Sequence, residues 1–283
     1  MIDESITSGF SPILLEEMES IRLMNRTDTK YLTDSHTLED ILADAGRCGY
    51  RILETDGHRL NAYDSLYYDT AELKMFIDHR NCHLVREKVR TRTYLSSGVT
   101  FLEVKRKNNH GRTRKNRMEI SRELFSDLGE SASACSWLAC HSDFRPQMLS
   151  PSVETVFERM TFVNPEMSER ITVDTDIRFI NLRTGLRSSL GEAVIIELKQ
   201  DGREQSRMKN ILSAHRVKPI KISKYCIGIT ATDPAARVGR FKQKARIIEK
   251  INNNFYLQCC TQTTAEPLWT RVNSLTYNQF LSL

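Results

Sequence analysis

Hydrophobic and polar residues alternate along several stretches of this chain with the two-residue period of a β-strand. The clearest stretch is "LVREKVRTRTYL" (84–95), where basic residues fill every second position and Val85 and Val89 face the other way. Stretches 99–107 and 112–120 alternate similarly, with "SSG" and "NNHG" as turns between the three. The pattern predicts a three-stranded meander with one apolar and one charged face. The charged face would carry Arg86, Lys88, Arg90, Arg92, Glu103, Lys105, Lys107, Lys115, Arg117 and Glu119.

Other stretches alternate as strands or repeat with helical spacing. Strands are predicted at 26–32, 64–70, 153–163, 170–180, 193–199 and 219–229, and helices at 13–25, 35–47, 203–215 and 239–253. Residues 121–148 are expected to be helical and rich in loops. We divide the chain into one domain over residues 1–230 and a C-terminal helix and tail over 231–283, packed on that domain.

Two interpretations fit a sheet with one charged face. The simpler is a sheet whose charged face meets solvent. The alternative is a sheet closed on itself with the charges inside. Later strands favour closure because they repeat the chemistry, with Glu197 and Lys199 on one face and Val194, Ile196 and Leu198 on the other. The apolar faces could then bury the predicted amphipathic helices. We therefore predict an α+β fold: a closed antiparallel β-barrel with a charged lumen and helices packed outside.

Composition narrows the function only slightly. The chain has 283 residues, of which 27% are charged and 40% hydrophobic, and its net charge is +5. This charge is low for a nucleic-acid-coating surface, so we expect no nucleic-acid partner. The sequence shows no transmembrane run, no signal peptide and no C-x-x-C spacing among its seven cysteines. These features predict a cytoplasmic protein.

A lumen lined with cations is unstable unless an anion of high charge density occupies it. Arginine grips phosphate oxygens through two hydrogen bonds, and lysine adds a compact charge, so a phosphate chain is the natural ligand. The interspersed glutamates would repel phosphate. Their presence is explained if they bind Mg²⁺ or Mn²⁺, which bridges to phosphate oxygens.

Nine short segments, in order, resemble the VTC-type polyphosphate polymerase domain of the triphosphate tunnel (CYTH-like) superfamily. They are "RTDTKY", "LYYDT", "VRTRTY", "FLEVKRK", "GRTRKNR", "FERMTF", "RITVDTDIRF", "IIELK" and "IKISKY". The CYTH relatives begin with E-x-E-x-K, whereas this chain has "RTDTKY" with only Asp28 in the acidic positions. This departure favours the polymerase branch over the triphosphatase and cyclase branches.

The resemblance implies roles for individual residues. Arg90, Arg92, Lys105 and Arg159 would hold the β- and γ-phosphates of the substrate. Glu197 matches the family's metal-binding glutamate, and Glu103 is a second, weaker candidate. Further phosphate-binding residues, implied by the resemblance or added from the alternating pattern, would be Lys30, Lys88, Lys115, Arg117, Arg170, Lys199, Lys221, Ser223 and Lys224.

The expected activity is transfer of the γ-phosphoryl group of a nucleoside triphosphate, ATP, onto inorganic polyphosphate, with Mn²⁺ or Mg²⁺ as cofactor and a separate membrane partner as an option. One alternative is a metal-dependent tripolyphosphatase or nucleoside triphosphatase on the same fold. Another is a non-catalytic module that binds polyphosphate, inositol phosphates or RNA. The charged faces show almost no aromatic residues for base stacking, which disfavours RNA.

Overall fold

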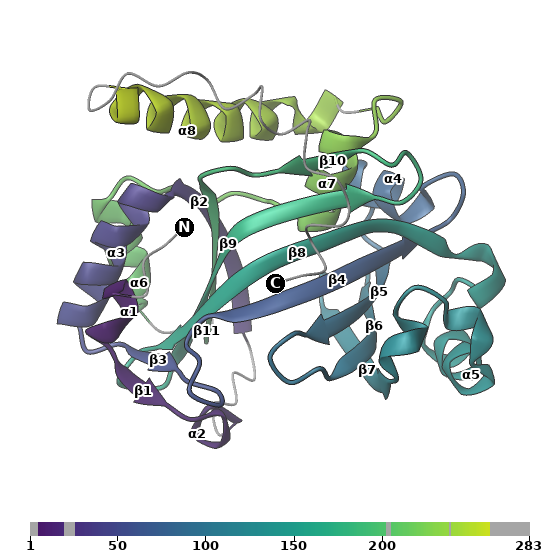
Figure 1. The fold of residues 1–283 in the computed structure, drawn as a ribbon, viewed down its shortest axis with the longest axis horizontal. Helices are drawn as coiled ribbons and strands as arrows, with labels where there is room; N and C mark the ends of the chain where they lie inside the picture. Colours follow the sequence, from purple (N-terminus) through teal and green to yellow (C-terminus); the bar gives the residue numbers. More distant parts are fainter. Residues whose placement is uncertain (1–4, 20–25, 202–204, 238, 261–283) are drawn as a thin grey trace.

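The structure is a computed structural model that describes residues 5–19, 26–201, 205–237 and 239–260. One large sheet with helices around it forms the fold (Figure 1). The strands are β1 (Ser11–Ile13), β2 (Arg26–Asp34), β3 (Arg51–Leu53), β4 (Asn61–Asp69), β5 (Arg86–Tyr94), β6 (Thr100–Lys107), β7 (Thr113–Ile120), β8 (Ser150–Val163), β9 (Glu169–Asn181), β10 (Arg187–Ser189) and β11 (Ala193–Asp201).

The helices are mostly short, apart from the last one. They are α1 (Ser5–Ser8), α2 (Leu15–Glu19), α3 (Ser35–Arg47), α4 (Lys74–Arg80), α5 (Ala132–His141), α6 (Arg207–Ala214), α7 (Lys224–Thr232) and α8 (Lys242–Cys260). The described residues also form four 3₁₀ turns: η1 (Arg122–Phe125), η2 (Leu128–Glu130), η3 (Pro146–Met148) and η4 (Gly239–Phe241). Among the residues in view, no helix has the length and apolar character needed to cross a membrane.

The main path of the sheet is antiparallel and runs in the order β2-β11-β9-β8-β4-β5-β6-β7. Its two end strands, β2 and β7, do not pair with each other in the described part of the chain. The predicted α+β sheet is confirmed, but hydrogen bonds between strands do not close it into a barrel. A non-strand segment occupies the edge of β2 instead: Tyr31 forms an isolated bridge with Pro219, and the Ile220 N–H donates to the Lys30 carbonyl at 2.8 Å.

The apolar faces of the strands pack against helices, as the alternation predicts. Helices α3 and α6 cover β2, β11, β9 and β8 through a core that includes Leu38, Ile41 and Leu198. Around β5, β6 and β7, the core joins Val89, Leu102 and the α5 segment. In Figure 1, α3 and α6 lie near β2 and β11, at one end of the strand order, and α5 lies near β6 and β7, at the other end. These cores fix the opposite, charged face of each strand toward the interior.

Helix α7 covers the charged face of the sheet at one end. Its Tyr225 packs in one core with Tyr67 of β4, Phe157 of β8 and Ile195 of β11. Ile195 and Tyr67 belong to the same alternating rows as Glu197 and Ser65, so α7 lies on the inner side of the sheet. Apolar packing therefore fills one end of the inner face and leaves the charged rows beside the first residues of α7.

One predicted element is wrong and another is confirmed only in part. The strand predicted at 219–229 is helix α7 over most of its length, because Ser223 caps the helix by accepting from the Cys226 N–H. The helix predicted at 13–25 is confirmed over Leu15–Glu19 (α2) and wrong at its first residue, because Ser11–Ile13 pairs in parallel with β3. Residues 20–25 of that prediction, and the polar tail from 261, lie outside the described residues. Asn252 of α8 contacts Leu190 and Glu192, so this helix packs beside β11.

Candidate functional site

Charged residues from seven strands (β2, β5, β6, β7, β8, β9 and β11) share the inner face of the curved sheet. The register places Arg90 opposite Glu103 and Glu103 opposite Arg117. Toward the other end of the strand order it places Lys30 opposite Glu197. Side chains of residues that are paired across antiparallel strands point to the same side. The alternating charges predicted from the sequence therefore form one surface, and three of its acidic side chains, those with little exposure to solvent, have cations around each.

The first acidic centre is Glu103 of β6, whose side chain is 2% exposed. The Nε of Arg90 donates to its Oε2 at 2.6 Å, and the ammonium of Lys115 forms a second ion pair. Arg90 also donates to the Tyr67 hydroxyl at 3.0 Å. Although burial opposes ionisation, Arg90 and Arg92 and then Lys115 hold the Glu103 pKa well below its usual range. Glu103 is thus a buried anion balanced by cations from neighbouring strands.

The second centre is Glu197 of β11. Lys199 on the same strand lies 3.1 Å from its Oε1, and Lys30 of β2 lies 3.6 Å from its Oε2. Burial favours the neutral acid, but the charges of Lys30 and Lys199 keep the Glu197 pKa well below its usual value. Both carboxylate oxygens therefore have a lysine partner.

The third centre is Asp174 of β9, with a side chain 1% exposed. Arg159 of β8 binds it through two parallel hydrogen bonds of 2.5 and 2.8 Å. Lys224, the first residue of α7, forms an ion pair with the same carboxylate. The α7 cap residue Ser223 accepts a hydrogen bond from Lys88 of β5 at 2.7 Å. Helix α7 therefore delivers two polar residues to the charged face and connects β9 with β5.

Aromatic rings lie beneath the arginines of this surface. Tyr63 and Phe157 stack with their centroids 5.3 Å apart, and the guanidinium groups of Arg92 and Arg159 lie 5.2–5.5 Å from these ring centroids. Arg92 is 6% exposed and donates to Ser65 at 2.8 Å. The expectation that charged faces hold almost no aromatics is wrong, because Tyr63, Tyr67 and Phe157 share the inner rows. Arginine already lies over the rings of Tyr63 and Phe157.

The electrostatic effects show that opposite parts of the sheet face each other. Although the Lys105 side chain of β6 reaches solvent, the surrounding protein partly desolvates its ammonium group, and this desolvation, followed by the charge of Lys30 on end strand β2, lowers the pKa of Lys105. Burial likewise lowers the pKa of Lys88 and of Lys224 to about 8. Around Tyr67, burial raises the phenol pKa, yet the surrounding cations outweigh it and bring the value to about 7. The inner face is therefore a single electropositive surface.

The remaining residues that were predicted to bind phosphate form no direct ion pair with the three acidic centres in the part of the chain that the structure describes. Lys105 lies on the inner row between Glu103 and Lys107 and is exposed to solvent. Arg117 lies with its guanidinium 4.8 Å from the Phe101 ring centroid, and Arg170 pairs across the sheet with Lys199. Lys221 is exposed on the segment before α7, and within the described residues no ion pair joins it to the three centres.

Sequence reasoning missed three residues of the site or left their role open. Asp174 alternates with apolar residues on β9, a pattern that suits either a metal ligand or a partner of arginine, and it binds Arg159 and Lys224. Tyr67 has the spacing of a core residue, yet its hydroxyl reaches Arg90. Ser65 carries no signal beyond sharing a face with Tyr67 on β4. The shared odd-numbered row of β4 could have indicated both of these side chains.

Among the described residues, no group of three or more His, Cys, Asp or Glu side chains is placed to hold an ion. Glu103 and Glu197 are each held by two cationic side chains and lie in separate centres.

Several solved structures resemble the chain weakly. A Vibrio parahaemolyticus protein titled as a candidate adenylate cyclase is 13% identical, with 73% of this chain and 98% of that chain covered and a TM-score of 0.42. A Hippeastrum protein, titled as a candidate adenylyl cyclase with a dominant triphosphatase activity, is 15% identical, with 73% and 96% covered and a TM-score of 0.47. A Pyrococcus horikoshii protein is 12% identical, with 72% and 98% covered and a TM-score of 0.40. Likenesses this remote carry no information on activity.

Two further comparisons concern the sequence itself. No curated protein matches the chain. The VTC domain family matches residues 25–232, which is more than half of the 283 residues and spans every acidic centre of the inner face. The chain therefore belongs to the VTC domain family.

Proposed function

We propose that this protein is a polyphosphate polymerase that transfers the γ-phosphoryl group of a nucleoside triphosphate, ATP, onto a growing polyphosphate chain. Membership of the VTC family supports a polyphosphate-related phosphoryl transfer. The observation that carries the finer proposal is the inner face itself. Its cations outnumber the three carboxylates they surround, and several are buried enough to have lowered pKa values. Such a surface is stabilised by an anion with many closely spaced negative charges.

The geometry suits the triphosphate end of a nucleotide. Arg90, Arg92 and Arg159 present planar donors that can each grip two phosphate oxygens, and Lys105 adds a point charge. Before substrate binds, Arg90, Arg92 and Arg159 are held by ion pairs, by a hydroxyl or by ring contacts, whereas Lys105 is exposed. Phosphoryl transfer needs alignment and neutralisation of charge more than covalent chemistry. The inner face supplies these two requirements.

The acceptor in this proposal is the terminal phosphate of the chain. It is already an anion at neutral pH, so the transfer requires no general base, and the described face offers carboxylates already engaged with cations. Lys88, Ser223 and Lys224 would hold the phosphates beside helix α7. The donor and acceptor would therefore meet in line along the inner rows of β5, β6 and β8.

Glu197 is the residue we propose for holding Mn²⁺ or Mg²⁺. The donor set fits an ion shared with the substrate, because Mg²⁺ commonly takes only one or two carboxylates and completes its shell with phosphate oxygens and water. It does not fit a site made by protein alone. When bound, such an ion adds positive charge between phosphate oxygens. Glu103, enclosed by Arg90 and Lys115, is the weaker ligand of the two.

Incubation of the protein with ATP and Mn²⁺, followed by gel electrophoresis, tests the proposal. A ladder of phosphate chains is expected, and it should disappear in Arg92→Ala and persist in Lys209→Ala, a variant at an exposed α6 position. Release of orthophosphate without a ladder would establish the hydrolase instead. Metal-independent polyphosphate binding without ATP turnover would establish a non-catalytic module.

A further inference from the structure

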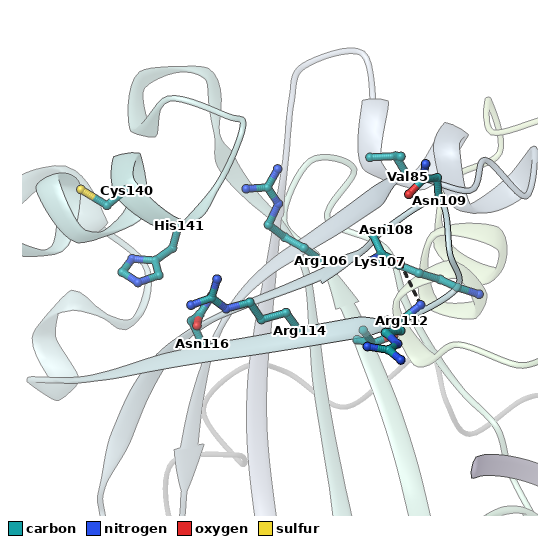
Figure 2. A pocket seen from close by; sticks show the side chains of 11 residues that line it. Val85, Arg106, Lys107, Asn108, Asn109, Arg112, Arg114, Asn116, Cys140 and His141 are labelled. Atoms are coloured by element: carbon teal, nitrogen blue, oxygen red, sulfur yellow. Dashed lines mark hydrogen bonds between the residues drawn. The ribbon is translucent and has the colours of Figure 1, made fainter. Parts of the chain in front are cut away.

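A second basic surface lies outside the charged face, at the hairpin that connects β6 and β7. A pocket with a volume of about 620 Å³ lies there, between the hairpin and the end of α5. Figure 2 shows the side chains that line it. Its cations are Arg106, Lys107, Arg112 and Arg114. Neutral polar groups complete the wall: Asn108, Asn109, Thr113, Asn116 and His141. No carboxylate belongs to this lining.

The strand register forces two arginines of this pocket together. Arg106 of β6 is directly opposite Arg114 of β7, and both alternate with inner-face residues, so they lie on the outer side of the sheet. Like charges in this position repel. Glu87 and Asp143 compensate Arg106 at 2.7 and 2.5 Å. Within the described chain, Arg112 and Arg114 have no such acidic partner. This repulsion is relieved when an external anion binds.

The hairpin itself is well fixed. The Asn108 side chain accepts from the Arg112 N–H at 2.9 Å, and the two backbones pair through Asn108 N–H and the Arg112 carbonyl, also at 2.9 Å. Gly111 adopts a φ of 77°, which a glycine tolerates without strain. Arg112 and Arg114 therefore extend from a rigid turn, and an incoming anion would not have to order the loop first.

One residue belongs to both basic surfaces. Lys107 ends the inner row that contains Glu103 and Lys105, where it pairs across the strands with Arg86, and it also lines the outer pocket. The cationic inner face thus continues at Lys107 onto the outer side of the hairpin. A ligand of compact shape could use either surface alone, whereas a long phosphate chain can contact both.

We propose that the pocket at the β6–β7 hairpin is an accessory polyphosphate-binding site, which holds a segment of the chain outside the inner face. The inference rests on the proposed function for the identity of its ligand, inorganic polyphosphate. Arg112 and Arg114 bind phosphate oxygens of the emerging chain, and Lys107 connects this segment with the phosphates on the inner row.

The test compares Arg112→Glu/Arg114→Glu with the wild-type full chain by calorimetric titration, without ATP. Long-chain inorganic polyphosphate should bind at least about tenfold more weakly to the variant, because two charged contacts are reversed. Inorganic triphosphate, which is short enough for the inner face alone, should bind unchanged. Lys242→Glu/Arg246→Glu on α8 makes the same change of charge on exposed positions and should bind both ligands nearly as wild type does.

Each other result overturns the inference. Unchanged binding of long chains excludes the site. If the α8 variant weakens the binding of long chains as much as the hairpin variant does, the effect is one of net charge. If the hairpin variant weakens the binding of triphosphate as much as that of long chains, the effect lies on the inner face. Inositol hexakisphosphate that binds as tightly as the chain, with the same loss in the variant, makes this a site for compact anions. Arg112→Gln/Arg114→Gln repeats the test should charge reversal perturb folding, as thermal denaturation would reveal.

The binding assay separates this inference from the polymerase proposal. If ATP yields no ladder but the hairpin variant still loses affinity for long chains alone, the accessory site stands and the polymerase proposal fails. If the ladder forms, the hairpin variant should make shorter products at an unchanged initial rate of ATP consumption. Products of wild-type length would contradict the accessory role.

Discussion

Replacing Arg90 by alanine would test both the chemistry and the stability of the charged face. The guanidinium of Arg90 contacts Glu103 at 2.5 and 2.6 Å and Tyr67 at 3.0 Å. Its removal takes away a donor proposed to hold the transferring phosphate. It also leaves Glu103, which is 2% exposed, with Lys115 as its remaining ion-pair partner and Arg92 as a further positive charge nearby.

Two magnitudes follow from these contacts. The loss of one preorganised electrostatic stabiliser typically lowers kcat by about 10²–10³-fold. Separately, a buried charge that loses its partner costs about 3–5 kcal/mol, and because Lys115 remains we expect the lower end, about 3 kcal/mol. For a chain of this size that corresponds to a fall in Tm of about 6–12 °C. The variant should therefore be both slow and less stable.

The double variant Arg90→Ala/Glu103→Gln separates the two effects. Neutralising Glu103 removes the unpaired charge, so the Tm should recover most of its loss while the turnover of ATP stays at least about 10²-fold low. Thermal denaturation and a steady-state ATP assay at saturating substrate measure the two quantities. Wild-type turnover in either variant would refute the role of Arg90, and a Tm that does not recover would refute the pairing argument.

Three further predictions concern the rest of the site. In Asp174→Asn, the repulsion between Arg159 and Lys224 should lower the free energy of unfolding by about 3 kcal/mol. Inorganic triphosphate should then raise the Tm of the variant by more than it raises the Tm of wild type, as thermal denaturation with and without triphosphate would show. Equal increases in Tm would contradict this. Because burial lowers the pKa of Lys88 and Lys224 to about 8 and phosphate binds their protonated forms, the affinity for triphosphate should fall as pH rises through about 8. Binding of triphosphate near pH 8 should also take up protons, and calorimetry in two buffers of different ionisation enthalpy measures this uptake. If no protons are taken up, or if Lys88→Met takes up as many as wild type, these lysines do not bind the phosphates. Finally, a Cβ at Gly228 of α7 would lie 2.8 Å from a β8 side chain and 2.9 Å from a β9 ring. Gly228→Ala should therefore displace α7 and lower the free energy of unfolding by about 1–3 kcal/mol. An unchanged Tm would show that the helix can adjust.

The sequence carried enough information to predict the charged rows. Val89 and Leu102 had to meet an apolar partner, so the residues between them had to face the other way. That logic is local, since it needs only the two-residue period and a core on one side. It predicted the inner-face positions of Arg90, Glu103 and Lys199 without any knowledge of how the strands are ordered.

The same logic failed at helix α7. The stretch "IKISKYCIGI" is rich in β-branched residues and alternates as a strand would. Its helical form depends on distant contacts: Tyr225 packs on Tyr67 and hydrogen-bonds Asp69, and Gly228 fits closely against β8 and β9. Tertiary packing of this kind outweighs local propensity. The one local sign was Ser223, a good helix cap three residues before the Cys226 N–H.

The pairing of carboxylates with cations on the inner face affects how easily a bound phosphate polymer could move along it. Because Glu103, Asp174 and Glu197 are each held by two basic groups, a phosphate of the proposed polyphosphate ligand would exchange partners with them instead of filling an empty site. The gain for each phosphate is then a small difference between large opposing energies. A polymer that advances by one unit leaves one set of partners as it meets the next, and the vacated carboxylates regain their own. Such a lining offers little friction, so even a tightly held chain need not be trapped at any single position.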